Sequence, residues 1–431
     1  MDHLPLHLLL VAIFTLMGIL IYIKLTYPFW NTQPVFHTYD FWRHWYSSQP
    51  YLIQSGYPVR TRFCNFTNIK TSNYLEIGES EKKAAVNLIQ SYSIPDESAI
   101  HMFNIENLDT YMTGQSTASF ISFYYEDAFE VLPASLTMNP LITDTTLIDV
   151  IKKPAALITS RMIELWISEI KYPVYFIDFI TVNREKADKG ISRELIQTHE
   201  YIQRRQSLDN QNIKKDTSAI QISLFKKEVD LCKGIVPLVV YESSIFYIHN
   251  GQKNDPIKKL PAHFILVEIH RRNIQLLADF LETVKSKYRC FGISEIPNLA
   301  GFIDKGILRI YVVQKGAEIY SAYFFRDSRT AFEDRGALLI LAGSIKNTNS
   351  SELFYTGFLR SLREILKKTS IFRIIMIERI SQNIQIYNEF KKTKEEIGEN
   401  SAAYYLYNFI VPGQTFSTGQ TFSREDCFLV F

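Results

Sequence analysis

Cysteine is scarce in this sequence: 431 residues contain four, namely Cys64, Cys232, Cys290 and Cys427. They form no CxxC pair, and no pair of histidines lies near any of them in the chain. Zinc sites and disulfide-stapled folds both need clustered cysteines, so neither is indicated. The simplest interpretation is a protein that works in a reducing compartment.

An excess of charge of one sign is also missing. Lys and Arg number 47 and Asp and Glu number 45, which leaves a net charge of +2. Nucleic-acid-binding proteins concentrate positive charge on one face, so we expect no nucleic-acid partner. We interpret the short basic clusters as solvated faces, which could also lie near anionic lipid: Lys82-Lys83, Arg204-Arg205, Lys226-Lys227 and His270-Arg271-Arg272.

Several catalytic motifs are absent as well. The chain has no glycine-rich phosphate loop, no HExxH and no Ser-His-Asp order, so nucleotide triphosphatase, metalloenzyme and hydrolase readings have no support. We predict no metal site. What the chain does have is length and 46% hydrophobic residues, enough for one very large core or two ordinary ones.

The N-terminus carries a long uncharged run from Leu4 to Ile23. Twenty helical residues rise about 30 Å, which matches the hydrocarbon core of a bilayer. A cleaved signal peptide is the alternative, but Tyr22 to Tyr27 offers no small-residue cleavage site. Basic residues such as Lys24 and Arg43 follow the run rather than precede it. We therefore predict a single-pass membrane protein whose body faces the cytosol.

A strand, loop and helix are predicted between Pro173 and Gln206. Residues 174–182 form an apolar run whose only charge is Asp178, which is typical of a buried strand. A polar loop ends at Gly190, and apolar residues then recur at helical spacing. Free N–H groups at the start of such a helix form a cradle for phosphate. An ordinary buried strand and amphipathic helix remain the alternative.

Two short segments carry a family resemblance. Phe29 to Val35 reads FWNTQPV and resembles the FWxTQPV segment of eukaryotic N-myristoyltransferases, or glycylpeptide N-tetradecanoyltransferases, of the GNAT-like superfamily. Ala403 to Phe409 reads AYYLYNF and resembles the family's YYLYNW signature. The segment FIDFITVNREKADKGISRELI also follows the family's strand, basic loop and helix without a gap. The resemblance covers about Pro28 to Phe431, as a divergent, membrane-anchored member.

The resemblance implies an α/β fold of two GNAT-like halves with pseudo-two-fold symmetry, preceded by one transmembrane helix. The domains would be an anchor at 1–25, an acyl-CoA-binding half at 26–250 and a second half at 251–431 that forms the peptide groove. A turn-rich stretch at 249–256 supplies the boundary. Beyond it, the pattern predicts a strand and helix within 265–286, a hairpin at 308–325 and an amphipathic helix through 358–366.

The family chemistry implies transfer of a long-chain acyl group, myristoyl in the family, from acyl-CoA to the N-terminal glycine amine of a protein. The backbone amides of Phe179 and Ile180 would form the oxyanion hole. The carboxylate of Phe431 would accept the amine proton, unless the terminal strand merely packs. Acyl-CoA would be a co-substrate rather than a resident cofactor, held by Phe29, Trp30, Thr181, Val182, Asp188, Lys189, Gly190, Ile191 and Ser192.

Departures from the family pattern leave a second function open. We find neither the family's TAG turn nor its T-x-R-Y-x-H run. Glu185, Ala187 and Gly190 stand where the family has basic loop residues, and the spacer before the last strand looks longer. Asp178 replaces an asparagine that faces the substrate amine, so it attracts the amine and shares the base role, or pairs with a buried Arg or Lys. The alternative function is a catalytically silent, membrane-tethered scaffold that binds acyl-CoA or an acylated protein.

Overall fold

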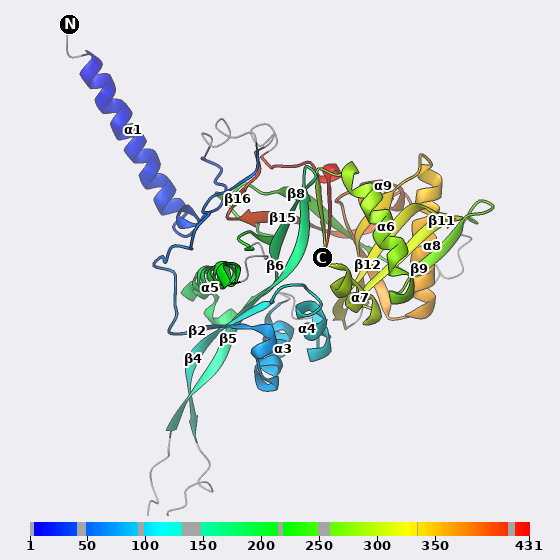
Figure 1. Ribbon diagram of the computed structural model, residues 1–431, viewed down its shortest axis with the longest axis horizontal. Helices are drawn as coiled ribbons and strands as arrows, with labels where there is room; N and C mark the ends of the chain where they lie inside the picture. Colours follow the sequence, from blue (N-terminus) through cyan, green and yellow to red (C-terminus); the bar gives the residue numbers. More distant parts are fainter. Residues whose placement is uncertain are drawn as a thin grey trace, which may run out of the picture.

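The computed structural model describes residues 4–40, 49–93, 99–131, 148–213, 219–248, 259–333, 335–412 and 419–431. Helices flank an extended β-sheet, and one long helix projects from the body (Figure 1). The predicted α/β class is confirmed.

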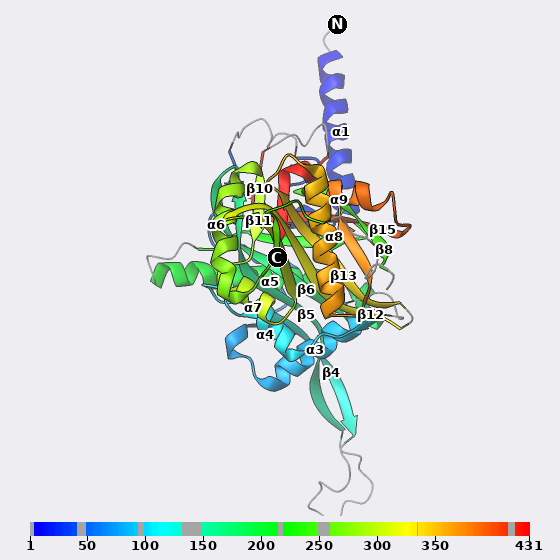
Figure 2. The same cartoon turned by 90° about the vertical axis from the view of Figure 1, so that its right-hand side faces the viewer.

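The projecting helix is α1, Leu4–Thr26, at the place where the sequence predicts a membrane span. Its segment Leu8–Thr26 is long and apolar enough to cross a membrane, and none of that segment is buried in the body. Both views show its N-terminal part projecting away from the body (Figures 1 and 2). Only Tyr27 and Pro28 separate it from the FWNTQPV segment.

The first part of the chain builds long antiparallel strands with helices beside them. Its elements are η1 (Trp30–Thr32), β1 (Tyr51–Leu52), β2 (Ile69–Asn73), η2 (Tyr74–Glu76), α3 (Glu79–Tyr92), β3 (Ala99–His101), α4 (Ile105–Met112), β4 (Phe120–Val131), β5 (Ile148–Ile167), β6 (Ile170–Val182), η4 (Arg184–Lys189), α5 (Ile191–Ile213), β7 (Ser223–Glu228) and β8 (Val239–Tyr247). The predicted strand, loop and helix are therefore β6, η4 and α5.

The second part repeats the mixture of strands and helices. Its elements are β9 (Ile265–Ile269), η6 (Arg271–Asn273), α6 (Ile274–Val284), η7 (Lys285–Lys287), β10 (Cys290–Ile293), α7 (Ile296–Asp304), β11 (Leu308–Lys315), β12 (Glu318–Phe332), β13 (Gly336–Lys346), α8 (Ser351–Lys368), β14 (Phe372–Glu378), α9 (Asn383–Phe390), β15 (Glu396–Tyr407), β16 (Phe409–Ile410), η8 (Arg424–Asp426) and β17 (Cys427–Val430). The predicted strand–helix pair, hairpin and amphipathic helix are β9–α6, β11–β12 and α8.

Helix α8 shows why the apolar spacing in the sequence predicted an amphipathic helix. Ser350 caps its first turn by accepting a hydrogen bond from the Leu353 amide. Phe354, Phe358 and Leu362 then recur at helical spacing and are buried against β11 and β12. Burial of such a stripe is what stabilises a helix of this length in water.

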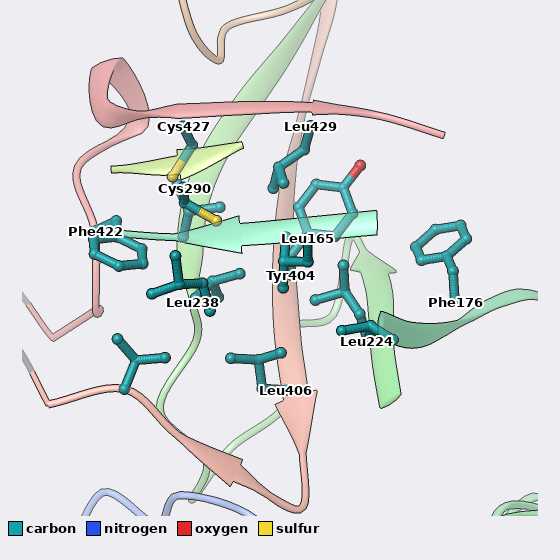
Figure 3. Packing of buried hydrophobic residues seen from close by; sticks show 14 of the residues in the cluster. Leu165, Phe176, Leu224, Leu238, Cys290, Tyr404, Leu406, Phe422, Cys427 and Leu429 are labelled. Atoms are coloured by element: carbon teal, nitrogen blue, oxygen red, sulfur yellow. The ribbon is translucent and has the colours of Figure 1, made fainter. Parts of the chain in front are cut away.

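One 15-stranded sheet runs through both parts, in the order β17-β10-β5-β6-β7-β15-β8-β14-β13-β12-β11-β9, with β2, β3 and β4 paired off this path. The last strand, β17, lies parallel to β10, which pairs antiparallel with β5. The end of the chain therefore lies at the middle of the molecule (Figures 1 and 2). A cluster of buried apolar residues from β5, β6, β7, β15 and β17 packs around it (Figure 3). The predicted boundary at 249–256 lies outside the described residues.

Candidate active site

The FWNTQPV segment is held against β15. The Tyr407 hydroxyl donates to Gln33 Oε1 at 2.8 Å, and the Asn408 amide donates to the Pro34 carbonyl at 2.6 Å. The Trp30 ring stacks on Phe225 of β7, with centroids 5.9 Å apart. The two segments that carry the family resemblance therefore contact each other, although they lie at opposite ends of the sequence.

Strands β6 and β7 diverge at the centre of the sheet. Their parallel pairing covers only Tyr175 to Ile177 on β6 and Ser223 to Phe225 on β7. Strand β6 nevertheless continues to Val182 and stays paired with β5 on its other side. Residues 178–182 thus have one edge that β7 does not pair. Such an edge can accept an extended chain that carries amide groups.

A β-bulge lies at the point of divergence. Ile158 opposes Ile180 and Ser160 opposes Ile177, so Asp178 and Phe179 together oppose the single residue Thr159. A bulge disrupts the ladder and redirects main-chain groups locally. The Phe179 amide donates to the Thr159 hydroxyl at 3.2 Å. To act as an oxyanion donor, the Phe179 amide would have to share its hydrogen between the Thr159 hydroxyl and the oxyanion, or give up its bond to Thr159.

Asp178 is paired with a buried arginine. Arg161 Nε donates to Asp178 Oδ2 at 2.8 Å, and the two side chains are 0% and 3% exposed. Burial raises the pKa of Asp178, while the guanidinium of Arg161 acts in the opposite direction. Of the two readings of Asp178, a pair with a buried cation is the arrangement found. Its attraction for an amine stays a prediction.

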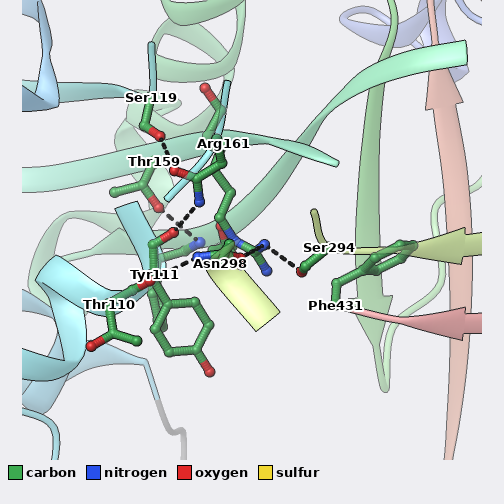
Figure 4. A network of polar contacts seen from close by, with 12 residues as sticks. Thr110, Tyr111, Ser119, Thr159, Arg161, Ser294, Asn298 and Phe431 are labelled. Carbon is green, nitrogen blue, oxygen red and sulfur yellow. Dashed lines mark hydrogen bonds and ion pairs between the residues drawn. The ribbon is translucent and has the colours of Figure 1, made fainter. Parts of the chain in front are cut away.

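Arg161 also ties Asp178 to the second half of the fold (Figure 4). Its Nη1 donates to Ser294 at 2.8 Å and to Asn298 Oδ1 at 3.0 Å. Asn298, in α7, donates in turn to the carbonyls of Thr110 and Thr113 at the C-terminal end of α4. The site is therefore held from both halves.

Phe431 lies beside this arginine network. Strand β17 aligns Val430 with Ile293, which places Phe431 next to Ser294 (Figure 4). The Phe431 ring lies 4.7 Å from Phe176, measured between centroids, and is 6% exposed. Arg326 Nη1 donates to the main-chain oxygen of Phe431 at 3.2 Å. The arrangement directs the end of the chain toward the point where β6 and β7 diverge.

A second buried ion pair lies on the β7 side of the divergence. Lys226 follows Phe225, the last residue of β7 that pairs with β6, and its Nζ contacts Glu378 Oε1 at 2.6 Å. The Glu378 side chain is 1% exposed. The two diverging strands thus carry Asp178 on one side and Lys226 on the other, each with a buried partner of opposite charge.

The loop after β6 turns directly into α5. Gly190 has a φ of 75° and ends η4, and α5 begins at Ile191. The first amides of an α-helix have no partner within the helix, and here they belong to Ile191 and Ser192, directly after Gly190. The anion cradle at these residues stays a prediction. Lys186 is engaged in an ion pair with Glu126, which reduces the positive charge of the loop. The backbone of Asp188 lies in η4.

The inward face of α5 becomes polar beyond its first two turns. His199 bonds Ser122 at 2.8 Å and Ser160 at 2.9 Å, and Gln203 Nε2 donates to Ser223 at 2.9 Å. Glu200 and Arg204 are also buried, at 2% exposure each. The interpretation of Arg204-Arg205 as a solvated face is therefore wrong for Arg204, because helical periodicity turns that side chain inward.

Burial raises the pKa of the Glu200 carboxyl to about 7, although Ser223 and Arg204 act in the opposite direction. A raised pKa in the folded state means that Glu200 favours folding at low pH, and that this contribution is lost as pH rises through about 7. We expect Glu200→Gln to stabilise the protein above that pH by about 2–4 kcal/mol and to change little below about pH 4.5.

Thermal unfolding of the two proteins across this pH range measures the difference. Burial lowers the pKa of neighbouring His199 to about 3 and raises that of Tyr407 well above its usual range, so neither titrates in this window. Arg204 stays protonated throughout. A stability difference that does not vary with pH would contradict the assignment of the titration to Glu200.

The structure brings most of the predicted residues to two neighbouring places. Asp178 pairs with Arg161, and the Phe431 ring packs on Phe176, whose ring the Arg161 guanidinium also faces. Phe179 follows Asp178 at the bulge, and Trp30 contacts Phe225 where β7 leaves β6. The others follow along the open edge or at the start of α5, or pack behind Trp30: Ile180, Thr181, Val182, Lys189, Gly190, Ile191, Ser192 and Phe29. Ile180 is 42% exposed on that edge.

Solved structures with the same architecture are found, although no protein-family model matches the sequence and no curated protein matches it. Two crystal structures of Saccharomyces cerevisiae N-myristoyltransferase with bound myristoyl-CoA match at TM-score 0.66 and 12% identity. They cover 94% of this chain and 94% and 99% of theirs. The chain has the N-myristoyltransferase fold. A third yeast structure, with myristoyl-CoA and inhibitors, matches at TM-score 0.64 and 12% identity over 92% of this chain and 90% of its own.

The N-myristoyltransferase fold, which we inferred from FWNTQPV, AYYLYNF and the segment 176–196, is therefore confirmed. Sequence reasoning missed Arg161 and Arg326. It also placed Lys226 on a solvated face, which is wrong because the Lys226 ammonium pairs with buried Glu378. Arg161 lies within a largely apolar stretch that reads as a strand, and a charge in such a stretch is a signal for a buried partner. Arg326 is followed directly by Asp327 and gives no such signal. The sequence does not identify the partner of either arginine, because the partners are distant along the chain. Asp178 is 17 residues from Arg161, and Phe431 is 105 residues from Arg326.

Proposed function

We propose that this protein is an acyl-CoA-dependent N-acyltransferase. The observation that carries the proposal is the divergence of β6 from β7 at a β-bulge, followed directly by the N-terminus of α5. The open edge suits the amide-bearing pantetheine arm of CoA, and the helix N-terminus suits its phosphates. The fold shared with proteins crystallised with myristoyl-CoA supports this assignment.

The finer proposal is transfer of a long-chain acyl group, myristoyl as in the yeast structures, to the N-terminal glycine amine of a protein. The neutral amine attacks the thioester carbonyl, negative charge develops on its oxygen, and CoA leaves as the thiolate. The amides of Phe179 and Ile180 hold that oxygen, a contribution of about 3–4 kcal/mol per donor. Gly190 to Ser192 hold the phosphates, and Trp30 closes the site over CoA.

The carboxylate of Phe431 is the proposed proton acceptor. An amine must be neutral to attack, and a carboxylate away from water is a stronger base than in solution. Asp178, shared with Arg161, would add negative potential that attracts the cationic amine before it loses its proton. No metal enters this scheme.

The domain and membrane assignments complete the proposal. Residues 26–250 would bind acyl-CoA and residues 251–431 would form the acceptor groove, while α1 anchors the protein with its body on the cytosolic side. Because a single myristoyl chain binds membranes only marginally, an anchored enzyme would meet its products at the surface where they gather.

A scaffold is the second candidate. The observation that favours it is that Asp178 is already neutralised by Arg161, while Arg326 contacts the main-chain oxygen of Phe431. A protein with both carboxylates engaged would bind acyl-CoA or an acylated protein without turnover.

Gly190→Ala tests the phosphate cradle. Nothing lies within 4 Å of the added Cβ, so the change acts through the φ of +75°, which costs an alanine about 1–2 kcal/mol. We expect the strained turn to move the first amides of α5 and to weaken CoA binding about tenfold. Isothermal titration with CoA measures this affinity.

Gly316→Ala is the matched control. Gly316 also has a positive φ, +60°, with nothing within 4 Å of its Cβ, and it forms the turn between β11 and β12. Both variants should lose similar stability, and only Gly190→Ala should lose CoA affinity. Equal CoA affinity in the two variants would remove the cradle from the proposal.

A further inference from the structure

A cavity of about 190 Å³ lies between α5, the FWNTQPV segment, β15 and residues 54–61. Helix α5 contributes Gln197, Glu200 and Arg204 on one stripe, Thr32 and Pro34 form a second wall, and Tyr407 lies on a third side. At roughly 30 Å³ per molecule, the volume would hold about six waters.

Three buried side chains of this wall each have one polar atom without a hydrogen-bond partner among the described residues: Glu200 Oε2, Gln197 Oε1 and Arg204 Nε. Glu200 and Arg204 are 2% exposed and Gln197 is 4% exposed. Buried polar atoms without partners are rare in folded proteins, because each forfeits the hydrogen bonds that it makes in water. Three around one cavity indicate a polar occupant.

The cavity lies in line with the proposed acyl-CoA site. It adjoins the same helix whose N-terminus forms the phosphate cradle, and Gln197 is about 9 Å along that helix from Ile191. Its second wall belongs to the segment that carries Trp30, which stacks on Phe225 where β7 leaves β6. An acyl chain that enters at the divergence and runs beside α5 would reach Gln197, Glu200 and Arg204.

We propose that this cavity receives the far end of the acyl chain and that the preferred acyl group carries a hydroxyl there. The inference rests on the proposed acyl-CoA-dependent transfer. A hydroxyl can donate to Glu200 or Gln197 and accept from Arg204 Nε–H. One group can therefore pair with an unpartnered acceptor and with the unpartnered donor. A charged end fits less well, because an anion would lie beside Glu200 and a cation would lie beside Arg204.

A methyl end would displace water and leave all three atoms unpaired. Sites built around a substrate hydroxyl reject the analogue that lacks it, by as much as about 10⁴-fold where every group is buried. We expect a preference of at least about tenfold here. The preference should depend on the polar atoms rather than on the volume of the cavity.

The experiment compares ω-hydroxytetradecanoyl-CoA with tetradecanoyl-CoA on the full chain in nanodiscs, by equilibrium binding. The wild type should bind the hydroxylated compound at least about tenfold more tightly. The double variant Gln197→Leu/Glu200→Leu should lose or invert this preference. Glu200→Gln, which keeps hydrogen-bonding capacity, should retain part of it if the double variant folds poorly.

Glu396→Gln is the matched control, because Glu396 Oε1 is likewise buried without a partner among the described residues but lies at the start of β15, outside the residues that line the cavity. Glu396→Gln should prefer the hydroxylated acyl-CoA by the same factor as the wild type. Equal affinity of the wild type for both compounds would overturn the inference and leave the acyl-CoA function standing. Binding of neither compound would refute the proposed function and the inference together.

Discussion

Arg161→Met is expected to lower the free energy of unfolding by about 3–5 kcal/mol, the range found when one member of a buried ion pair is removed. The methionine can pack among Tyr111, Phe176 and Phe302, which surround the guanidinium. The Asp178 carboxylate, however, then stays buried without its cation, and Ser294 and Asn298 lose their donor. Urea unfolding of the full chain in a mild detergent measures the loss.

A control variant on the same hairpin separates the effect of losing a buried cation from the effect of losing an exposed one. Lys171 pairs with Glu164 across β5 and β6, but its side chain is 51% exposed, so Lys171→Met should cost less than about 1 kcal/mol. The loss of unfolding free energy in Arg161→Met should also become smaller as pH falls, because a protonated Asp178 carries no charge that needs a cation. A loss of the same size in both variants would mean that the buried pair contributes nothing particular to the site.

Addition of a Gly-Ser extension after Phe431 is expected to reduce turnover about 10²–10⁴-fold while leaving acyl-CoA affinity unchanged. The extension converts the carboxylate at residue 431 into a neutral peptide carbonyl and removes the proposed proton acceptor. The Phe431 ring can stay packed against Phe176 and Tyr404, so the strand itself should persist. CoA release in the presence of an N-terminal glycine peptide measures turnover, and titration with acyl-CoA measures affinity.

Phe431→Leu is the matched variant, because it keeps the carboxylate and shortens the ring. We expect its turnover to remain within about tenfold of the wild type, since positioning rather than chemistry is disturbed. An extended chain that turns over normally would exclude the carboxylate as the base. A scaffold would show no turnover in any of these proteins and equal acyl-CoA affinity in all of them.

The sequence revealed those parts of the fold that depend on local pattern. Helix α5 follows its Gly190 stop and its apolar spacing, and α8 follows its Ser350 cap, because caps and periodicity act within a few residues. The hairpin around Gly316 was readable for the same reason. The FWNTQPV segment added the fold itself, which periodicity alone does not specify.

The sequence did not reveal the pairing of distant charges or the polar interior behind α5. Arg326 meets the main-chain oxygen of Phe431 only because β17 inserts beside β10. Glu200 and Arg204 occupy one stripe of a helix whose polar residues suggested solvent. The FWNTQPV segment and residues 54–61 pack over that stripe and bury it. The topology of the fold determines such contacts, so they cannot be predicted from the spacing of residues in the sequence.

The most direct test of the central claim is CoA release by the full chain in nanodiscs with a ladder of acyl-CoA chain lengths, with and without N-terminal glycine peptides. An acyl-CoA-dependent N-acyltransferase should release CoA with a long-chain donor only when the peptide is present, and mass spectrometry should find the acyl group on the peptide's N-terminal amine. Tight binding of acyl-CoA with no release and no acylated peptide, across every chain length, would contradict the account and leave the scaffold in its place.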